Sequence, residues 1–435
     1  MVDPVSQLII RLPPLLRLVV LLFGAVLIHL TIGTYHTFGN MLPYMASYMR
    51  NYTDPSIRIE HFMWVPTFQG CFPFAMVIGG ALALHVGPRM AAFIGCAIAT
   101  SSVALSFWTI KQSFFSFFLT YGALFGLGQG IAYVTAVATV INWAPEKVGL
   151  VSGIVAAGFG ISSSIFAPIQ THLINPHNLP STKDGYFLDK DLLERVPDVF
   201  LTLSAVYAVM QLIGLIVVCD PPAKVSSEGS STRYRTTSRD SQSSRDSDNS
   251  DSSDFLVNAS LNAMSLRPQE MLSSSTFYVL FSALFCCSFY ANMFYNLYKT
   301  FAETFVDDDF FLARAFAVAS VANAIARIAW GYLTDRTSFQ LIGMFICMGA
   351  THALFITATT KCFGPLYKAT NYGFLTLSTT CSGILLSIIS QFYLTSIGYT
   401  WLFIITAIFP FTAFLATSMI HWTPHGSIIT SRSLL

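Results

Sequence analysis

Long apolar stretches alternate with short polar loops along most of this chain. Windows of about 19 residues place six apolar runs before residue 220 and about five more after residue 275. A hydrocarbon layer about 30 Å thick takes roughly 20 apolar residues per helical crossing, so these runs are long enough to span a membrane. The expected spans are 16–40, 63–84, 90–110, 114–141, 149–174, 199–219, 277–298, 310–332, 341–359, 372–393 and 401–420.

The composition agrees with lipid as the main solvent of the chain. Hydrophobic residues make up 54% of the sequence and charged residues only 10%, so most of the chain would be costly to expose to water. Backbone groups in lipid must be hydrogen-bonded within their own element, which favours helices for continuous apolar runs. The eight cysteines lack the spacing of a metal site or a disulfide framework. We therefore predict an all-α polytopic membrane protein.

A polar segment divides the apolar runs into two sets. Residues 220–274 are rich in Ser, Asp and Arg, which predicts a disordered linker between a helical bundle at 1–219 and a second bundle at 275–421, followed by a tail at 422–435. Because an even number of spans, six, precedes the linker, we expect the linker to lie on the same side of the membrane as the N-terminus. If that side is the cytosol, Ser238 is a candidate phosphorylation site, because Arg235 lies three residues before it. A simple solvated tether is the alternative.

The first loop carries an indication of orientation. Asn51-Tyr52-Thr53 is an N-glycosylation sequon, which is used only if the first loop faces the lumen or the exterior. Arg11 and Arg17 precede an apolar run without a cleavage signal, so we expect an uncleaved signal anchor with a cytosolic N-terminus. We expect the plasma membrane rather than an internal one.

Small residues are concentrated in the fourth and fifth expected spans. Residues 126–133 read GLGQGIAY, 143–147 read WAPEK, and glycines recur at 149, 153, 158 and 160. Small residues let neighbouring membrane helices approach closely. The whole run resembles the oxalate/formate antiporter and monocarboxylate transporter branch of the major facilitator superfamily, in which Trp-Phe-Pro-x-Lys-Arg-Gly joins these helices. Ala144 replaces the Phe and Val148 replaces the Arg. The resemblance implies two six-helix bundles.

The second half contains a segment similar to the eighth helix of that family and its gating turn. Residues 326–336 read ARIAWGYLTDR. The resemblance implies that Gly331, Asp335 and Arg336 steady one state of the transport cycle at the cytosolic end. The matching first-half turn ends in Arg89 but has Leu84 and His85 where the family usually has Asp and a basic residue.

Arg327 is the main candidate for substrate binding. An ionisable side chain within a membrane helix usually faces a partner or an aqueous cavity, and a guanidinium matches the two oxygens of a carboxylate. The matching arginine in the resembling transporters binds substrate. A structural role in helix packing is the alternative. Asn323, one turn earlier, stands where proton-coupled carriers usually have Asp.

Polar side chains within two further spans are candidates for the cavity lining. In the first span these are His36, which lies seven residues after His29, and Asn40, which matches a Lys of the family. In the seventh span Tyr290 supplies a hydroxyl. Structural packing explains the two histidines equally well.

The second set of spans contains one helix fewer than the family pattern. Residues 349–373 resemble the tenth helix and the start of the eleventh, yet only four residues separate Arg336 from the apolar run that holds them. We therefore expect the second bundle to lack the ninth helix, which leaves about eleven spans. One fewer crossing would place the loop with Lys361 and Lys368 outside, against the preference of basic loops. A splice form, an imperfect gene model, or an apolar segment that does not span would each explain this.

These observations predict a carrier and no enzyme, since no nucleotide loop, metal-ligand group or nucleophile triad is present. We expect secondary active or facilitative transport of a small organic anion by alternating access, without a cofactor and without nucleic acid. A co-transported proton and an accessory membrane subunit stay open as partners beside the lipid bilayer. The alternatives are a non-transporting or truncated isoform with a regulatory or receptor-like role, and a transporter of a neutral or cationic solute.

Overall fold

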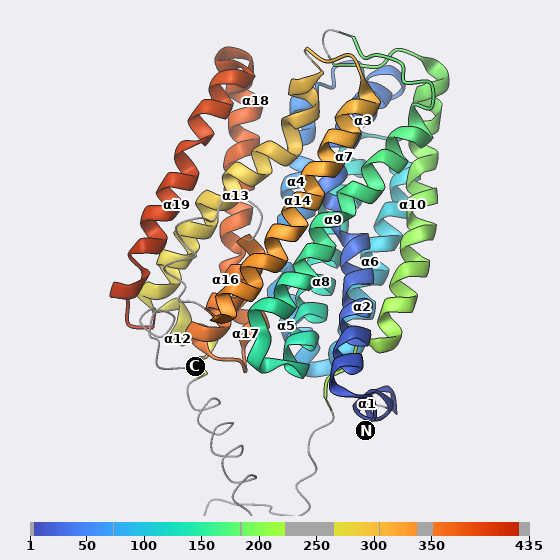
Figure 1. Cartoon of the computed structure of the whole chain (residues 1–435). Coiled ribbons are helices and arrows are strands. Elements are labelled where there is room, and N and C mark those ends of the chain that lie inside the picture. The colour runs from blue at the N-terminus through green and yellow to red at the C-terminus, as the bar shows by residue number, and fades with distance from the viewer. Residues whose placement is uncertain are drawn as a thin grey trace, which may run out of the picture.

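The computed structural model describes residues 4–72, 74–182, 185–221, 265–303, 305–336 and 351–425. All regular elements within these ranges are helices (Figure 1). Singly or joined end to end, they form ten helical spans that are long and apolar enough to cross a membrane. The predicted all-helical membrane fold is therefore confirmed.

Six spans come from the first half of the chain, as the apolar pattern predicts. The first runs from Pro14 to Tyr52 and continues well beyond the predicted residue 40. The elements are α1 (Pro4–Ile10), α2 (Pro14–Ile32), η1 (Gly33–Thr37), α3 (Phe38–Tyr52), η2 (Ile59–Met63), α4 (Trp64–Cys71), α5 (Ala75–Val86), α6 (Pro88–Thr109), α7 (Phe114–Phe117), η3 (Phe118–Leu124), α8 (Phe125–Trp143), η4 (Pro145–Lys147), α9 (Val148–Ile174) and α10 (Lys190–Val217).

Four spans come from the described part of the second half, together with one shorter apolar helix at Leu354–Phe363. The elements are α12 (Pro268–Leu272), α13 (Ser275–Ala302), α14 (Asp309–Arg336), α16 (Thr351–Phe363), α17 (Lys368–Leu375), α18 (Leu377–Thr406), α19 (Ile408–Ser418) and η5 (Ile420–Trp422).

The bundle has two ends, which we name by the linker. At the linker end, the Trp143 indole donates to the carbonyl of Cys219 over 2.6 Å, and Leu266 N–H donates to the carbonyl of Phe363 over 2.9 Å. The N-terminus and α1 lie at this end (Figure 1). The distal end carries the loops between α3 and η2, between α6 and α7, and between α9 and α10.

The predicted span 341–359 is not among the ten spans. Residues 337–350 lie outside the described part of the chain, but both flanks of this segment lie at the linker end. Asp335 contacts the start of α9 there, and Phe363 at the end of α16 bonds Leu266. The loop with Lys361 and Lys368 consequently lies at the linker end. If the linker end is cytosolic, this position agrees with the preference of basic loops for the cytosol.

The first span is interrupted by a tight 3₁₀ segment, η1. The hydroxyl of Thr34 donates to the carbonyl of Thr31, and that of Thr37 donates to the carbonyl of Thr34, both over 2.7 Å. Hydroxyl bonds of this kind compete with the backbone ladder and bend helices, and a 3₁₀ stretch within a helix often marks a functional position. The interruption places the polar sequence around His36 at mid-span.

Helices α9 and α14 pack against each other along most of their length, and Figure 1 shows them side by side at the centre of the bundle. A Cβ on Gly149 would lie 2.3 Å from the carbonyl oxygen of Gly331, and a Cβ on Gly331 would lie 2.2 Å from that of Gly149. No larger residue fits at either position without moving the helices apart. This contact joins the two halves of the molecule near the linker end.

Candidate functional site

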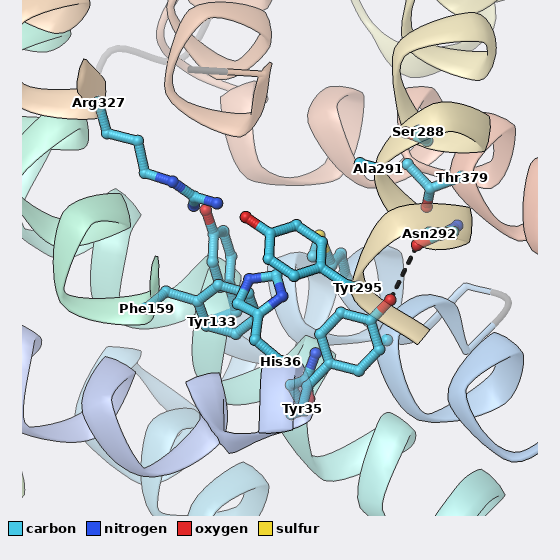
Figure 2. Close-up of a pocket in the computed structure, with 13 residues that line it drawn as sticks. Tyr35, His36, Tyr133, Phe159, Ser288, Ala291, Asn292, Tyr295, Arg327 and Thr379 are labelled. Atoms are coloured by element: carbon cyan, nitrogen blue, oxygen red, sulfur yellow. Dashed lines mark hydrogen bonds between the residues drawn. The ribbon is translucent and has the colours of Figure 1, made fainter. Parts of the chain in front are cut away.

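A small cavity of about 40 Å³ lies between the two halves. Polar and aromatic side chains from both halves face it (Figure 2). Its lining comprises Tyr35, His36, Gly70, Met76, Gln129, Tyr133 and Phe159 from the first half, and Ser288, Ala291, Asn292, Tyr295, Arg327 and Thr379 from the second.

Arg327 is held at the cavity by two hydrogen bonds. Its Nε donates to the side-chain oxygen of Asn323 over 2.7 Å, and its Nη1 donates to the carbonyl of Ala156 on α9 over 3.0 Å. The side chain is only 3% exposed, and its guanidinium points towards the hydroxyl end of Tyr295 (Figure 2). Among the residues that the structure describes, Arg327 forms no salt bridge with Asp or Glu. The cavity therefore has a fixed positive charge without a protein counter-charge in this part of the chain.

Aromatic rings form much of the remaining wall. The ring centroid of His36 lies 4.4 Å from that of Tyr295 and 4.9 Å from that of Phe159. The hydroxyl of Tyr35 donates to the side-chain oxygen of Asn292 over 2.8 Å, which links the first and seventh spans across the cavity (Figure 2). The wall thus combines flat apolar faces with a few oriented polar groups, as small-molecule sites usually do.

The structure brings some of the predicted substrate-binding residues together. Arg327 and His36 line the cavity, and Asn323 supports the guanidinium. Asn40 lies towards the distal end instead, where its amide donates to the carbonyl of Ala167 over 3.2 Å. Tyr290 is half-buried on α13 and is not part of the lining.

Further lining residues were missed at the sequence level. Tyr35 and Asn292 belong to polar stretches that the sequence does reveal, whereas Gln129, Tyr133 and Phe159 lie in the Gly-rich fourth and fifth spans and are typical of helix packing there. The presence of Gln129 within the apolar fourth span was the one available signal, because an amide in lipid needs a partner or a cavity.

The predicted gating residues divide into two groups at the linker end. Asp335 joins the two halves, since its carboxylate accepts hydrogen bonds from the N–H groups of Gly149 and Leu150, each over 2.8 Å. Gly331 packs one turn earlier against the same helix. Arg89 stays within the first half, where its Nε donates to the carbonyl of Val218 over 3.0 Å. Arg336 ends α14, and its side chain lies outside the described part of the structure.

Lys299 is a buried charge that the sequence analysis did not single out. Its Nζ lies 2.6 Å from a carboxylate oxygen of Asp309 and donates to the backbone and side-chain oxygens of Asn40 over 3.2 and 3.3 Å. At the end of a predicted span a lysine normally reaches the interface, so its sequence position resembles that of a solvated residue.

The two predicted modification sites differ in what the structure shows. Asn51 is exposed at the distal end of α3, where a glycan has access. Ser238 lies outside the described residues. Within the described residues, no group of three or more His, Cys, Asp or Glu side chains has the arrangement of a metal site.

Comparison with known proteins identifies relatives over most of the chain. It is 24% identical to apicoplast pyruvate carrier 1 of Toxoplasma gondii, over 86% of this chain and 83% of that one, and 24% identical to the oxalate:formate antiporter of Oxalobacter formigenes, over 79% and 78%. Shorter matches include monocarboxylate transporter 12 of Homo sapiens, with 28% identity over 26% of this chain and 21% of that protein. These matches confirm the resemblance predicted from the motifs.

The solved structures give the same fold. A D-xylose–proton symporter aligns over 95% of this chain and 99% of its own, with a TM-score of 0.58 and 12% identity. The profile described as Major Facilitator Superfamily matches residues 21–367. This multi-pass membrane protein therefore belongs to the Major Facilitator Superfamily.

Proposed function

We propose that the protein transports a small mono- or dicarboxylate by alternating access, with Arg327 contacting the carboxylate group. The relatives of the protein support an organic anion as the substrate, since they include a pyruvate carrier and an oxalate:formate antiporter. The fold supports transport, because carriers of this architecture bind substrate between their two halves near the middle of the membrane.

The buried charge of Arg327 is the observation that carries the proposal. A charged side chain inside a membrane protein is costly unless it is paired or faces water. Here the guanidinium is oriented by two neutral groups and faces the cavity, and no salt bridge in the described residues neutralises it. A carboxylate in the cavity would supply the counter-charge and accept the remaining N–H donors in planar geometry.

The dimensions of the cavity favour a small substrate. A cavity of about 40 Å³ has room for a small group such as a carboxylate beside Arg327 in this conformation. Contacts between the halves lie on both sides of the cavity, through Asp335 at the linker end and through Lys299 at the distal end. We expect a substrate to enter or leave when the contacts on one side separate, which is the basis of alternating access.

We also propose an orientation in which the linker end faces the cytosol. In this orientation the basic loop with Lys361 and Lys368 lies on the cytosolic side, which basic loops prefer. The sequon at Asn51 lies on the opposite side, where glycosylation takes place. The plasma membrane remains our expectation. The apicoplast location in the names of two Toxoplasma gondii relatives favours an internal membrane as the second candidate, and imaging of a tagged chain distinguishes the two.

Uptake of labelled pyruvate, oxalate and formate into proteoliposomes tests the proposed function. Breaking a buried charge pair costs about 2 to 5 kcal/mol, so we expect Arg327→Ala to lower the transport efficiency at least about 30-fold. Arg314→Ala is the matched control, because Arg314 is an exposed arginine on the same helix. It should transport like the parent protein.

Other outcomes would support the alternatives. Equal uptake by the parent protein and Arg327→Ala would remove the assigned role of Arg327. Uptake of a neutral or cationic solute that unlabelled carboxylates do not inhibit would assign another substrate class. Absence of uptake across all solutes, with the fold intact, would favour a non-transporting relative.

A further inference from the structure

A second group of buried charges lies at the distal end of the bundle, one helical turn beyond the cavity lining. Lys299 follows Tyr295 by four residues on α13, and it is fully buried. It forms a 2.6 Å ion pair with Asp309 at the start of α14. Both residues belong to the second half of the chain.

Residues of the first half complete the surroundings of this ion pair. The hydroxyl of Tyr44 donates to Asp309, the Asn175 amide donates to the same carboxylate over 3.0 Å, and Lys299 donates to Asn40. Separation of the two halves at the distal end would break all three contacts. The group therefore forms part of the distal closure.

A second acidic side chain, Glu303, would give this group a net negative charge if every member were ionised. It is 8% exposed, and its nearest carboxylate oxygen lies 4.0 Å from Nζ of Lys299, which Asp309 already neutralises. Neither oxygen of Glu303 accepts a hydrogen bond from the described residues. Two acids and one base would leave one negative charge buried, and buried groups of this kind usually take up a proton instead.

We propose that Glu303 is a proton-binding site that carries a proton while the distal end is closed and releases it when that end opens to water. This inference deepens the proposed transport cycle and rests on it for the opening step. It assigns the proton to the distal closure and leaves the Arg327 cavity free for the anion.

The environment of Glu303 gives the sign of the pH effect. Burial raises the pKa of Glu303 from its usual value to about 8, Lys299 lowers it in part, and Asp309 raises it. A first-half loop covers the carboxylate, because a Cβ built on Gly185 would lie 3.8 Å from its Oε2. Among the residues that the structure describes, the titratable groups that face Glu303 are Lys299 and Tyr298 on α13, Asp309 on α14 and Tyr44 on α3.

Opening the distal end would expose Glu303 to water and restore an ordinary carboxyl pKa of about 4.3. The proton then stabilises the closed state fully below that ordinary pKa, and the stabilisation is lost as the pH rises through about 8. Between these limits the ratio of closed to open molecules should fall about tenfold for each pH unit.

Distances between two spin labels at the distal end test this proposal without any substrate. Exposed positions Gln112 in the first half and Tyr393 in the second would carry the labels, in a background without the eight native cysteines. In liposomes we expect the closed-to-open ratio to fall about 100-fold between pH 5.5 and 7.5. Glu303→Gln should remove this dependence and stay closed, because the amide resembles the protonated acid.

Two further variants separate the proton site from general effects. Glu303→Asp keeps a carboxyl group and should retain a pH slope, and Asp307→Asn removes an exposed acid from the same loop and should retain the full slope. A parent protein without any slope, or a Glu303→Gln variant with an unchanged slope, would overturn the proposal. Failure of carboxylate uptake would contradict the proposed function and leave this distance measurement unaffected.

Discussion

The carboxylate of Asp335 offers the most direct test of how the halves close at the linker end. The first N–H groups of a helix have no partner within it, and Lys147, which precedes α9, provides no side-chain cap. Asp335 on α14 accepts hydrogen bonds from two of these groups, those of Gly149 and Leu150. One half of the molecule thus caps a helix of the other half.

The size of the effect follows from these two bonds. A hydrogen bond to a charged group contributes about 1.5 kcal/mol at the lower end of its range, and the positive end of the helix dipole adds a few tenths. Losing both bonds in Asp335→Ala therefore weakens the closure by about 3 kcal/mol. Since 1.4 kcal/mol is a factor of ten, the open state at the linker end should gain on the order of 100-fold in population. Asp335→Asn keeps one acceptor oxygen and should have a smaller effect.

Spin labels at exposed Met90 and Leu366 would measure this opening, because the two positions lie at the linker end of opposite halves. The expected result is a longer distance population in Asp335→Ala than in the parent protein, with Asp335→Asn between them. Asp307→Ala removes an exposed acid from the distal end and serves as the control. An unchanged distance distribution in Asp335→Ala would refute the idea that this cap holds the halves together.

Two further predictions concern the cavity and the orientation. Tyr35→Phe removes the donor of the 2.8 Å hydrogen bond to Asn292. Losing about 1 kcal/mol of binding free energy with this bond should raise KM for the carboxylate several-fold in the uptake assay. The control variant Tyr278→Phe, at an exposed tyrosine, should leave KM unchanged. If the distal end faces the lumen, synthesis of the parent protein in the presence of microsomes should yield a glycosylated chain, and the Asn51→Gln variant should carry no glycan. A parent chain without a glycan would argue against that orientation.

Most of the fold was predictable because lipid imposes a simple rule on sequence. Each crossing needs a long apolar run, so spans such as 90–110 and 199–219 agree with α6 and α10 within a few residues, except that α10 begins earlier. The pattern was less informative where polar residues enter a helix. The first span continues through Asn40 to Tyr52, because the polar side chains of this stretch are buried between helices instead of ending the span.

The candidate site was predictable only where one residue is unusual by itself. Arg327 stands out in any apolar run, whereas Phe159 and Tyr133 are ordinary in a membrane helix and become lining residues only through the packing of α8 and α9. Lys299 was missed for a related reason. Its partner Asn40 is distant in sequence, its partner Asp309 begins the next helix, and a lysine at a helix end is usually solvated.

The two closures differ in their chemistry, and this difference separates their responses. At the linker end the carboxylate of Asp335 accepts hydrogen bonds from two backbone N–H groups, so this contact contains one titratable group. At the distal end the contacts involve Lys299, Asp309 and Glu303, whose combined charge depends on bound protons. With the proposed proton on Glu303, a carrier that opens one end at a time would change its preference between the two ends when the pH changes at the distal side. Carboxylate binding at Arg327 and proton binding at Glu303 would then act on the same equilibrium between conformations through separate residues. This is sufficient to couple the transport of the anion to that of the proton without direct contact between them.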